Sequence, residues 1–149
     1  MPDFMQNADR IVGGEAAPSP IPWQVALLNP AGTFQFCGAT VLDAYTLLCA
    51  AHCQPAKSEK IRVGSTHRYN EGQVRDVAQV IYNTNSGFEY NSGTLNNDFV
   101  ILKLSNPLEL NDNVKPACLP SSSDYLDVSS TEERCFTSGW GTLESGLRS

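Results

Sequence analysis

The sequence predicts an all-β fold. Six short segments either alternate apolar and polar residues or are continuously apolar, as strands do when one or both faces are buried. Clusters of Gly, Pro, Asn, Asp and Ser, which are typical of turns, separate these segments. The cysteines are, in addition, spaced in a pattern typical of a disulfide framework. The six predicted strands lie at 23–28, 34–42, 46–49, 60–64, 74–82 and 99–104.

Length and charge narrow the class of protein. The chain has 149 residues, enough for one ordinary domain with a real core. Its formal net charge is −6 and its basic residues are dispersed, which argues against a nucleic-acid surface and a polybasic membrane patch. No segment is long and apolar enough to span a bilayer. We therefore expect neither nucleic acid nor membrane as a partner.

The N-terminal residues 1–10 are a short polar leader. They contain neither a basic start nor an apolar stretch of the usual length, so they are not a secretory signal. Arg10 is followed by Ile11, Val12 and two glycines, at the junction between this leader and the patterned sequence. We interpret the Arg10–Ile11 bond as a cleavage point, and a disordered tail leading into a first strand stays open as the alternative.

The first three predicted strands lead to a histidine. A Pro-rich stretch at 18–22 precedes strand 23–28, which is apolar enough to be buried on both faces. Turns at 29–32 and 43–45 then connect it to strands 34–42 and 46–49. Strand 46–49 leads through Ala50 and Ala51 to His52. Histidine titrates near neutral pH without perturbation, so His52 is a candidate general base, although a lone histidine is more often structural.

Five cysteines, at 37, 49, 53, 118 and 135, form no Cys-x-x-Cys pair and no cluster with zinc-like spacing. A disulfide framework formed in an oxidising compartment is the better interpretation. Cys37 and Cys53 fall on successive antiparallel segments. A bridge between them would close a loop of about 15 residues, contribute roughly 3 kcal/mol in the chain-entropy model, and hold the backbone beside His52.

Later segments supply the other titratable candidates. Residues 83–97 form an Asn-, Ser- and Gly-rich loop that ends at Asp98, directly before strand 99–104. Asp98 is either a turn residue or the carboxylate that accepts the Nδ1 proton of a histidine. His67 is interpreted as an exposed loop residue. Glu71, in the same loop, is a single carboxylate, which is too few ligands for a calcium site.

The C-terminal part of the chain is punctuated by prolines. Residues 114–120 are extended, as in a crossing between two units. After a polar loop, residues 135–142 predict the beginning of another strand. The chain ends seven residues after position 142, and a strand alone would have little stability.

Three stretches together resemble the trypsin and chymotrypsin family of serine endopeptidases. They are Arg10-Ile11-Val12-Gly13-Gly14, Ala50-Ala51-His52-Cys53, and the run from Asn97-Asp98 to Leu104. Pro22-Trp23-Gln24-Val25, Phe36-Cys37-Gly38, Cys118-Leu119-Pro120 and Gly139-Trp140-Gly141 are further landmarks. The resemblance implies two antiparallel Greek-key β-barrels. Residues 1–10 would be the activation peptide, 11–117 the first barrel, and 118–149 the crossing and the start of the second.

The resemblance also implies a mechanism. His52 would be the base, Asp98 would orient it, and an activating protease would cleave after Arg10 to free the Ile11 amine. Substrates would be proteins or peptides, macromolecular protease inhibitors are further partners, and no metal or organic cofactor is needed. The protein would be secreted.

Departures from the family pattern lead to two further expectations. The nucleophile motif Gly-Asp-Ser-Gly-Gly-Pro is absent, so the chain as given is expected to be inactive alone; a non-catalytic homologue used as a binding or regulatory module is the alternative. Cys49 replaces a Ser or Thr that can support the aspartate. Because a thiol is a weaker donor, we expect Asp98 to be held less firmly. Cys118 and Cys135 resemble cysteines whose partners lie outside this chain.

Overall fold

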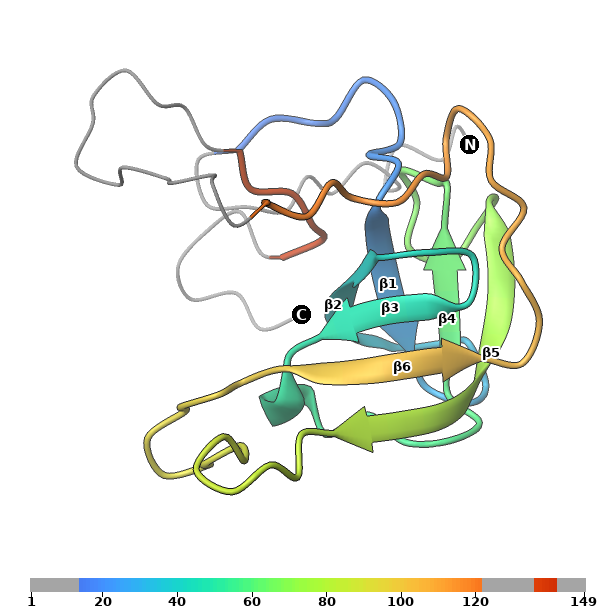
Figure 1. Cartoon of the computed structure of the whole chain (residues 1–149). Coiled ribbons are helices and arrows are strands. Elements are labelled where there is room, and N and C mark those ends of the chain that lie inside the picture. The colour runs from blue at the N-terminus through green and yellow to red at the C-terminus, as the bar shows by residue number, and fades with distance from the viewer. Residues whose placement is uncertain (1–13, 122–135, 142–149) are drawn as a thin grey trace, which may run out of the picture.

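The computed structural model describes residues 14–121 and 136–141. These residues form a closed, six-stranded antiparallel barrel (Figure 1), so the predicted all-β fold with an antiparallel barrel is confirmed. The strands are β1 (Gln24–Leu28), β2 (Gln35–Val41), β3 (Thr46–Cys49), β4 (Lys60–Val63), β5 (Gln73–Tyr82) and β6 (Val100–Leu104).

The strand order around the barrel is β1-β2-β3-β6-β5-β4, and β4 closes the ring by pairing with β1. The first three strands follow one another as neighbours. The chain then crosses from β3 to β4 on the far side of β1, which leaves β6 to fill the place beside β3. The described residues contain one helical element, the 3-10 turn η1 (Ala51–Cys53) at the start of this crossing.

The core fills the barrel with aliphatic side chains. In β4 and β6 burial alternates along the strand, as expected for strands with one face inward. β1 differs, because its residues from Val25 to Leu28 are all buried, as its continuous apolarity predicts. The largest fully buried side chains are Leu27, Leu28, Leu47, Ile61, Leu102, Val25, Val41, Val63, Val77, Val100 and Val114.

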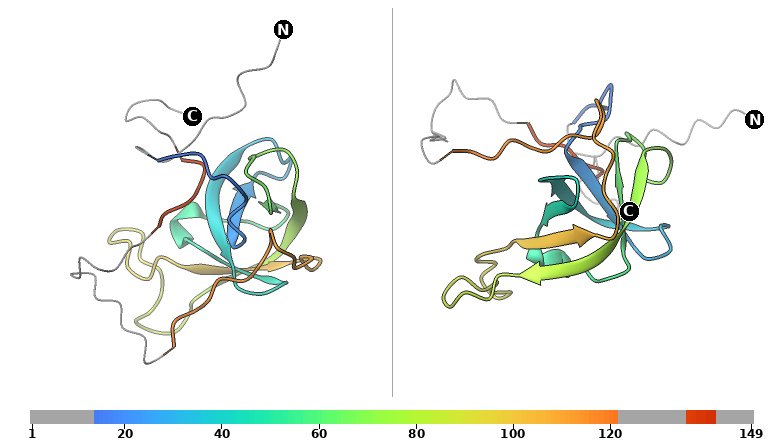
Figure 2. Two further views of the ribbon diagram at one scale, coloured as in Figure 1. Left: turned by 90° about the horizontal axis from the view of Figure 1, so that it is seen from above. Right: turned by 45° about the vertical axis from the view of Figure 1, so that its right-hand side comes forward.

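The longest strand, β5, pairs with two neighbouring strands of the barrel. Its first half pairs with β4 and its second half with β6, and the register shifts between Val77 and Gln79. An extra residue at such a bulge bends the strand. The bend lets one strand curve around the barrel, as the right-hand view of Figure 2 shows.

One predicted element is absent. The described part of the 135–142 stretch, residues 136–141, contains no strand, and Phe136 is 96% exposed. The prediction was wrong there because a strand is formed by hydrogen bonds to a neighbour, and no described residue pairs with this segment. Arg10, Ile11 and Cys135 lie outside the described residues, and the domain boundaries at 10 and 117 stay predictions. The described residues contain no helix that is long and apolar enough to cross a membrane.

Candidate active site

His52 projects from a tight corner at the end of β3. Ala50 is extended, and Ala51, which is fully buried, anchors the short η1 turn on the core. Gln54 ends the turn in a left-handed conformation (φ 49°, ψ 50°). The corner thus reverses the chain within a few residues and leaves the His52 side chain 54% exposed at the barrel edge.

Asp98 reaches the same corner because β3 and β6 are antiparallel neighbours. Cys49, the last residue of β3, lies opposite Val100, the first residue of β6. A residue just after β3 and a residue just before β6 therefore meet at one edge of the barrel. The register of the two strands brings together two side chains that are 46 residues apart in sequence.

Both oxygens of the Asp98 carboxylate bind His52. The backbone N–H of His52 donates to Asp98 Oδ1 at 2.8 Å, and Nδ1 of its ring lies 2.7 Å from Oδ2. One bond fixes the backbone of the histidine and the other fixes its ring. When Nδ1 donates its proton to the carboxylate, the lone pair of the neutral ring is on Nε2.

The contacts of Asp98 favour its ionised form. The hydrogen bond from the His52 side chain is the largest cause that lowers the pKa of Asp98 below its usual value, followed by the bond from the His52 backbone N–H. Hydrogen bonds to a carboxylate stabilise the charge. Asp98 is therefore a carboxylate at neutral pH, when it can orient His52 and stabilise its protonated form.

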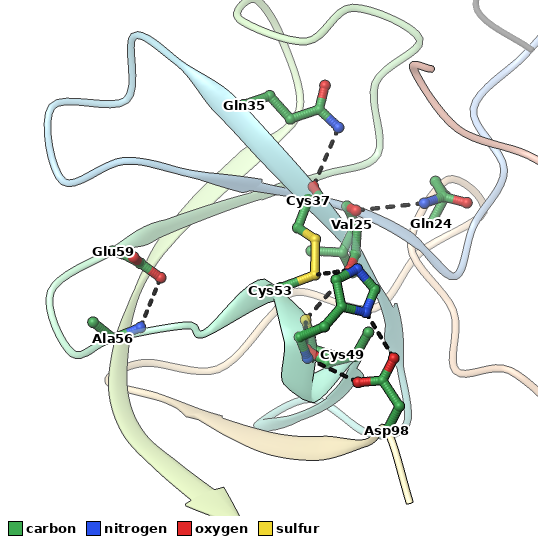
Figure 3. The surroundings of a disulfide bond; sticks show 12 residues. Gln24, Val25, Gln35, Cys37, Cys49, Cys53, Ala56, Glu59 and Asp98 are labelled. Atoms are coloured by element: carbon green, nitrogen blue, oxygen red, sulfur yellow. Dashed lines mark hydrogen bonds and ion pairs between the residues drawn. A yellow bond between two sulfur atoms is a disulfide. The ribbon is translucent and has the colours of Figure 1, made fainter. Parts of the chain in front are cut away.

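The predicted disulfide between Cys37 and Cys53 is formed, with a Cα–Cα distance of 6.1 Å. Figure 3 shows it at the same corner as Asp98. It ties β2 to η1 at the residue next to His52, and Cys53 Sγ lies 3.9 Å from His52 Nε2. The ligand atoms of Cys37, His52 and Cys53 lie within 4.8 Å of one another. Two of them are bonded to each other as the disulfide, so they offer a metal no thiolate.

The Cys49 thiol faces backbone carbonyl groups. Its Sγ donates to the carbonyl oxygens of Gly38 (3.4 Å) and Ala50 (3.5 Å), and no hydrogen bond joins it to Asp98. Burial raises the pKa of this thiol to about 11. Cys49 therefore gives Asp98 no hydrogen bond, and the carboxylate is held by the backbone N–H and the ring of His52. The expectation that Asp98 is held less firmly than with a hydroxyl at position 49 stays a prediction.

A shallow, open groove of about 370 Å³ lies beside Asp98. Its lining comprises Gln24, Gly38, Ala39, Thr40, Leu48, Cys49, Ala50, Asp98, Phe99 and Ser138. Neither Gln24 nor Ser138 was predicted to lie near the site. Gln24 could have been found, because it lies in one of the motifs that carry the family resemblance. No local sequence pattern indicated that Ser138 would lie near the site.

The remaining candidates lie in the loop between β4 and β5. His67 is partly buried there, less exposed than predicted, and its backbone N–H donates to Ser65 Oγ at 2.8 Å. Glu71 has a positive φ of 61°, and its carbonyl oxygen accepts a hydrogen bond from Arg62. Neither residue belongs to the His52 corner.

Known proteins are similar in sequence to this chain over almost its whole length. The family model described as Trypsin matches residues 10–148. Serine protease 1 of Rattus norvegicus is 36% identical, over 96% of this chain and 55% of the relative. Transmembrane protease serine 9 of the same organism is 36% identical, over 93% of this chain and 13% of the relative. The chain therefore spans about half the length of the first of these. Given this match and the closed antiparallel barrel, the chain belongs to the trypsin family of serine proteases.

Proposed function

We propose that this chain supplies the general base and the orienting carboxylate of a serine endopeptidase. The observation that carries the proposal is the paired contact of His52 with both oxygens of Asp98. Such a pair activates a serine hydroxyl for acyl transfer to and from a peptide or protein substrate. The same contact argues against a non-catalytic homologue, because such a protein has no need to keep His52 and Asp98 in place.

Each group has one role in the proposed reaction. Nε2 of His52 accepts the proton of the serine hydroxyl as the serine oxygen bonds to the substrate carbonyl carbon. The Asp98 carboxylate stabilises the imidazolium that results. The imidazolium then gives its proton to the leaving amine, and water later releases the acyl group from the serine by the same proton route. Neither a metal ion nor an organic cofactor takes part in these steps.

The nucleophile is the missing component. The family's Gly-Asp-Ser-Gly-Gly-Pro motif does not occur in the 149 residues, and we propose that they form the N-terminal portion of the catalytic domain. Alone they should not hydrolyse peptides efficiently, because the serine and the oxyanion hole contribute most to lowering the barrier.

Activation and location follow the family pattern in this proposal. An activating protease would cleave after Arg10, and the new Ile11 amine would then order the site. The protein would act outside the cell, in keeping with its Cys37–Cys53 disulfide. Macromolecular protease inhibitors would be its further partners, and nucleic acid and membranes would not.

A chimera tests the proposed roles. Residues 11–149 are joined to the complementary half of a trypsin-family protease, and hydrolysis of a peptide ester is measured. We expect His52→Ala to lower kcat by at least about 10³-fold and His67→Ala, the matched control, to leave it unchanged. A folded chimera that keeps its activity with His52→Ala would refute the role of His52.

The 149-residue chain alone provides the second arm. Incubated with a fluorophosphonate probe, it should show no specific labelling. Stoichiometric labelling of any serine in this chain would show that it carries its own nucleophile.

A further inference from the structure

Asp98 lies on a loop and not on a strand. The loop of residues 83–99 connects β5 to β6, and the two strand ends that flank it, Tyr82 and Val100, are paired (lower left in Figure 1). Long loops are the segments of a fold in which several conformations are usual. A carboxylate on such a loop needs local contacts that hold it against His52, because reacting groups tolerate only small errors in position.

The backbone turns tightly at Asp98. The backbone N–H of Phe99 donates to the carbonyl oxygen of Asn97 at 2.8 Å, so Asp98 is the central residue of a three-residue turn. Asn97 enters this turn with a φ of 55°, in the left-handed region. Asparagine adopts this region more readily than most residues, because its short side chain can hydrogen-bond locally. The conformation of Asn97 therefore sets the direction in which the next residue leaves the loop.

The side chain of Asn97 bridges the loop. Its Nδ2 donates to the carbonyl oxygen of Glu89 at 3.2 Å. The residue after Glu89, Tyr90, is partly buried and packs against the barrel core. Just beyond it, the backbone N–H of Asn91 donates to the carbonyl oxygen of Asn96 at 3.0 Å. The bond from Asn97 thus ties the end of the loop to a point that the core already holds.

These contacts form one continuous path from the core to the proposed catalytic pair. We propose that Asn97 is a positioning residue, whose bond to the Glu89 carbonyl and left-handed backbone hold the turn that directs Asp98 toward His52. The result of this positioning is the contact of both Asp98 oxygens with the backbone N–H and the ring of His52. Only the catalytic consequence of the inference rests on the proposed function, since the contacts themselves do not involve the nucleophile.

Hydrogen exchange at the His52 amide reports on this positioning, because its N–H donates to Asp98 Oδ1 at 2.8 Å. Exchange is measured by NMR in the full 149-residue chain. Asn97→Gly removes the side-chain donor but tolerates the positive φ. Loss of one hydrogen bond should raise the open population of the turn, and with it the exchange rate at His52, about fivefold. The Leu104 N–H, which donates to the Tyr45 carbonyl, reports opening of the barrel and should not share this rise.

Two further variants separate the side-chain bond from the shape of the backbone. Asn91→Gly is the matched control, because it places the same glycine in the same loop and removes the acceptor of the Gly93 and Thr94 N–H groups. Exchange at His52 should stay unchanged in this control. Asn97→Ala removes the same bond as Asn97→Gly and also places alanine in the left-handed region, so exchange at His52 should rise further.

The two amides decide between the outcomes. A rise at His52 that exceeds the rise at Leu104 in Asn97→Gly, and that is absent from Asn91→Gly, supports the proposal. An unchanged rate at His52 in Asn97→Gly would overturn it, since the backbone conformation alone would then hold Asp98. An equal rise at both amides would overturn it too, because Asn97 would then only stabilise the barrel as a whole.

The catalytic consequence is measured in the chimera of residues 11–149 with the complementary half of a trypsin-family protease. Asn97→Gly should lower kcat about fivefold and leave KM unchanged, because the lost bond acts on the pair that moves the proton. Unchanged kcat together with faster exchange at His52 would overturn the role in catalysis. A chimera that stays active with His52→Ala would refute the proposed function instead, and the exchange rates would still decide whether Asn97 positions Asp98.

Discussion

The His52 corner and the 136–141 segment border the same open groove but are held in different ways. The corner joins two paired strands, β3 and β6, and carries a disulfide and two bonds to one carboxylate. Within the described part of the chain, the segment is attached by hydrogen bonds with Gln24, Thr66 and Arg68. The corner should therefore be the more rigid of the two, whereas the segment can open locally.

The stronger attachment is at the corner that carries the proposed catalytic groups. Catalytic groups lose rate when they are misplaced by about 1 Å, so they benefit from a closed sheet and a covalent tie. The four predictions below test whether the barrel and the corner form one cooperative unit, in order of decreasing effect.

Leu102→Ala should have the largest effect. Leu102 is fully buried in β6 and pairs with Leu47 of β3 and Val80 of β5. The cavity left behind should lower the free energy of unfolding by about 3 kcal/mol, measured by urea denaturation. Leu119→Ala, at a position that is 67% exposed, is the control and should change it little. Equal effects at the two positions would mean that the barrel is not the cooperative unit.

Removal of the disulfide should have a similar or slightly smaller effect. With Cys37→Ala and Cys53→Ala combined, the unfolded chain regains the freedom of a closed loop, which should cost about 3 kcal/mol of stability. The comparison is the urea midpoint of Cys118→Ala, which removes an exposed free thiol. If the double variant matched this control, the disulfide would contribute nothing to holding the corner.

Asp98→Asn should change how stability depends on pH. The pKa of Asp98 is lowered in the folded chain by its bonds from His52. Its stabilising contribution is therefore complete above the unfolded pKa, near 3.9, and is lost as the pH falls through the lower, folded pKa. Between pH 6 and pH 2, the unchanged chain should lose more stability than Asp98→Asn, measured by thermal melting. Parallel melting curves for the two proteins would contradict this linkage.

The smallest effect should come from the Lys60–Asp76 ion pair. Its atoms are 2.7 Å apart, but the two side chains are 33% and 53% exposed. A double-mutant cycle with Lys60→Met and Asp76→Asn should give a coupling below about 1 kcal/mol, falling further with added salt. A larger, salt-independent coupling would show that the β4–β5 wall depends on this pair as well as on the core.

The predicted elements agree with the structure where a local pattern decides them. Residues 46–49 were predicted as a strand from their apolarity, and β3 has these bounds. In β5 the strand itself was predicted, but not the bulge between Val77 and Gln79. The bulge arises because β5 must follow β4 and then β6, which the residues of β5 alone do not encode.

The sequence by itself determined where the six barrel strands lie and pointed to His52, Asp98 and the Cys37–Cys53 pair, because periodicity, turn residues and motifs are local properties. Tertiary structure alone decided three other features: Asp98 binds His52 through both oxygens, Cys49 donates to backbone carbonyls, and residues 136–141 dock on the 64–72 loop without forming a strand. Each of these depends on which groups meet across the closed barrel. That register is set by contacts between residues far apart in the chain, where no local pattern carries the information.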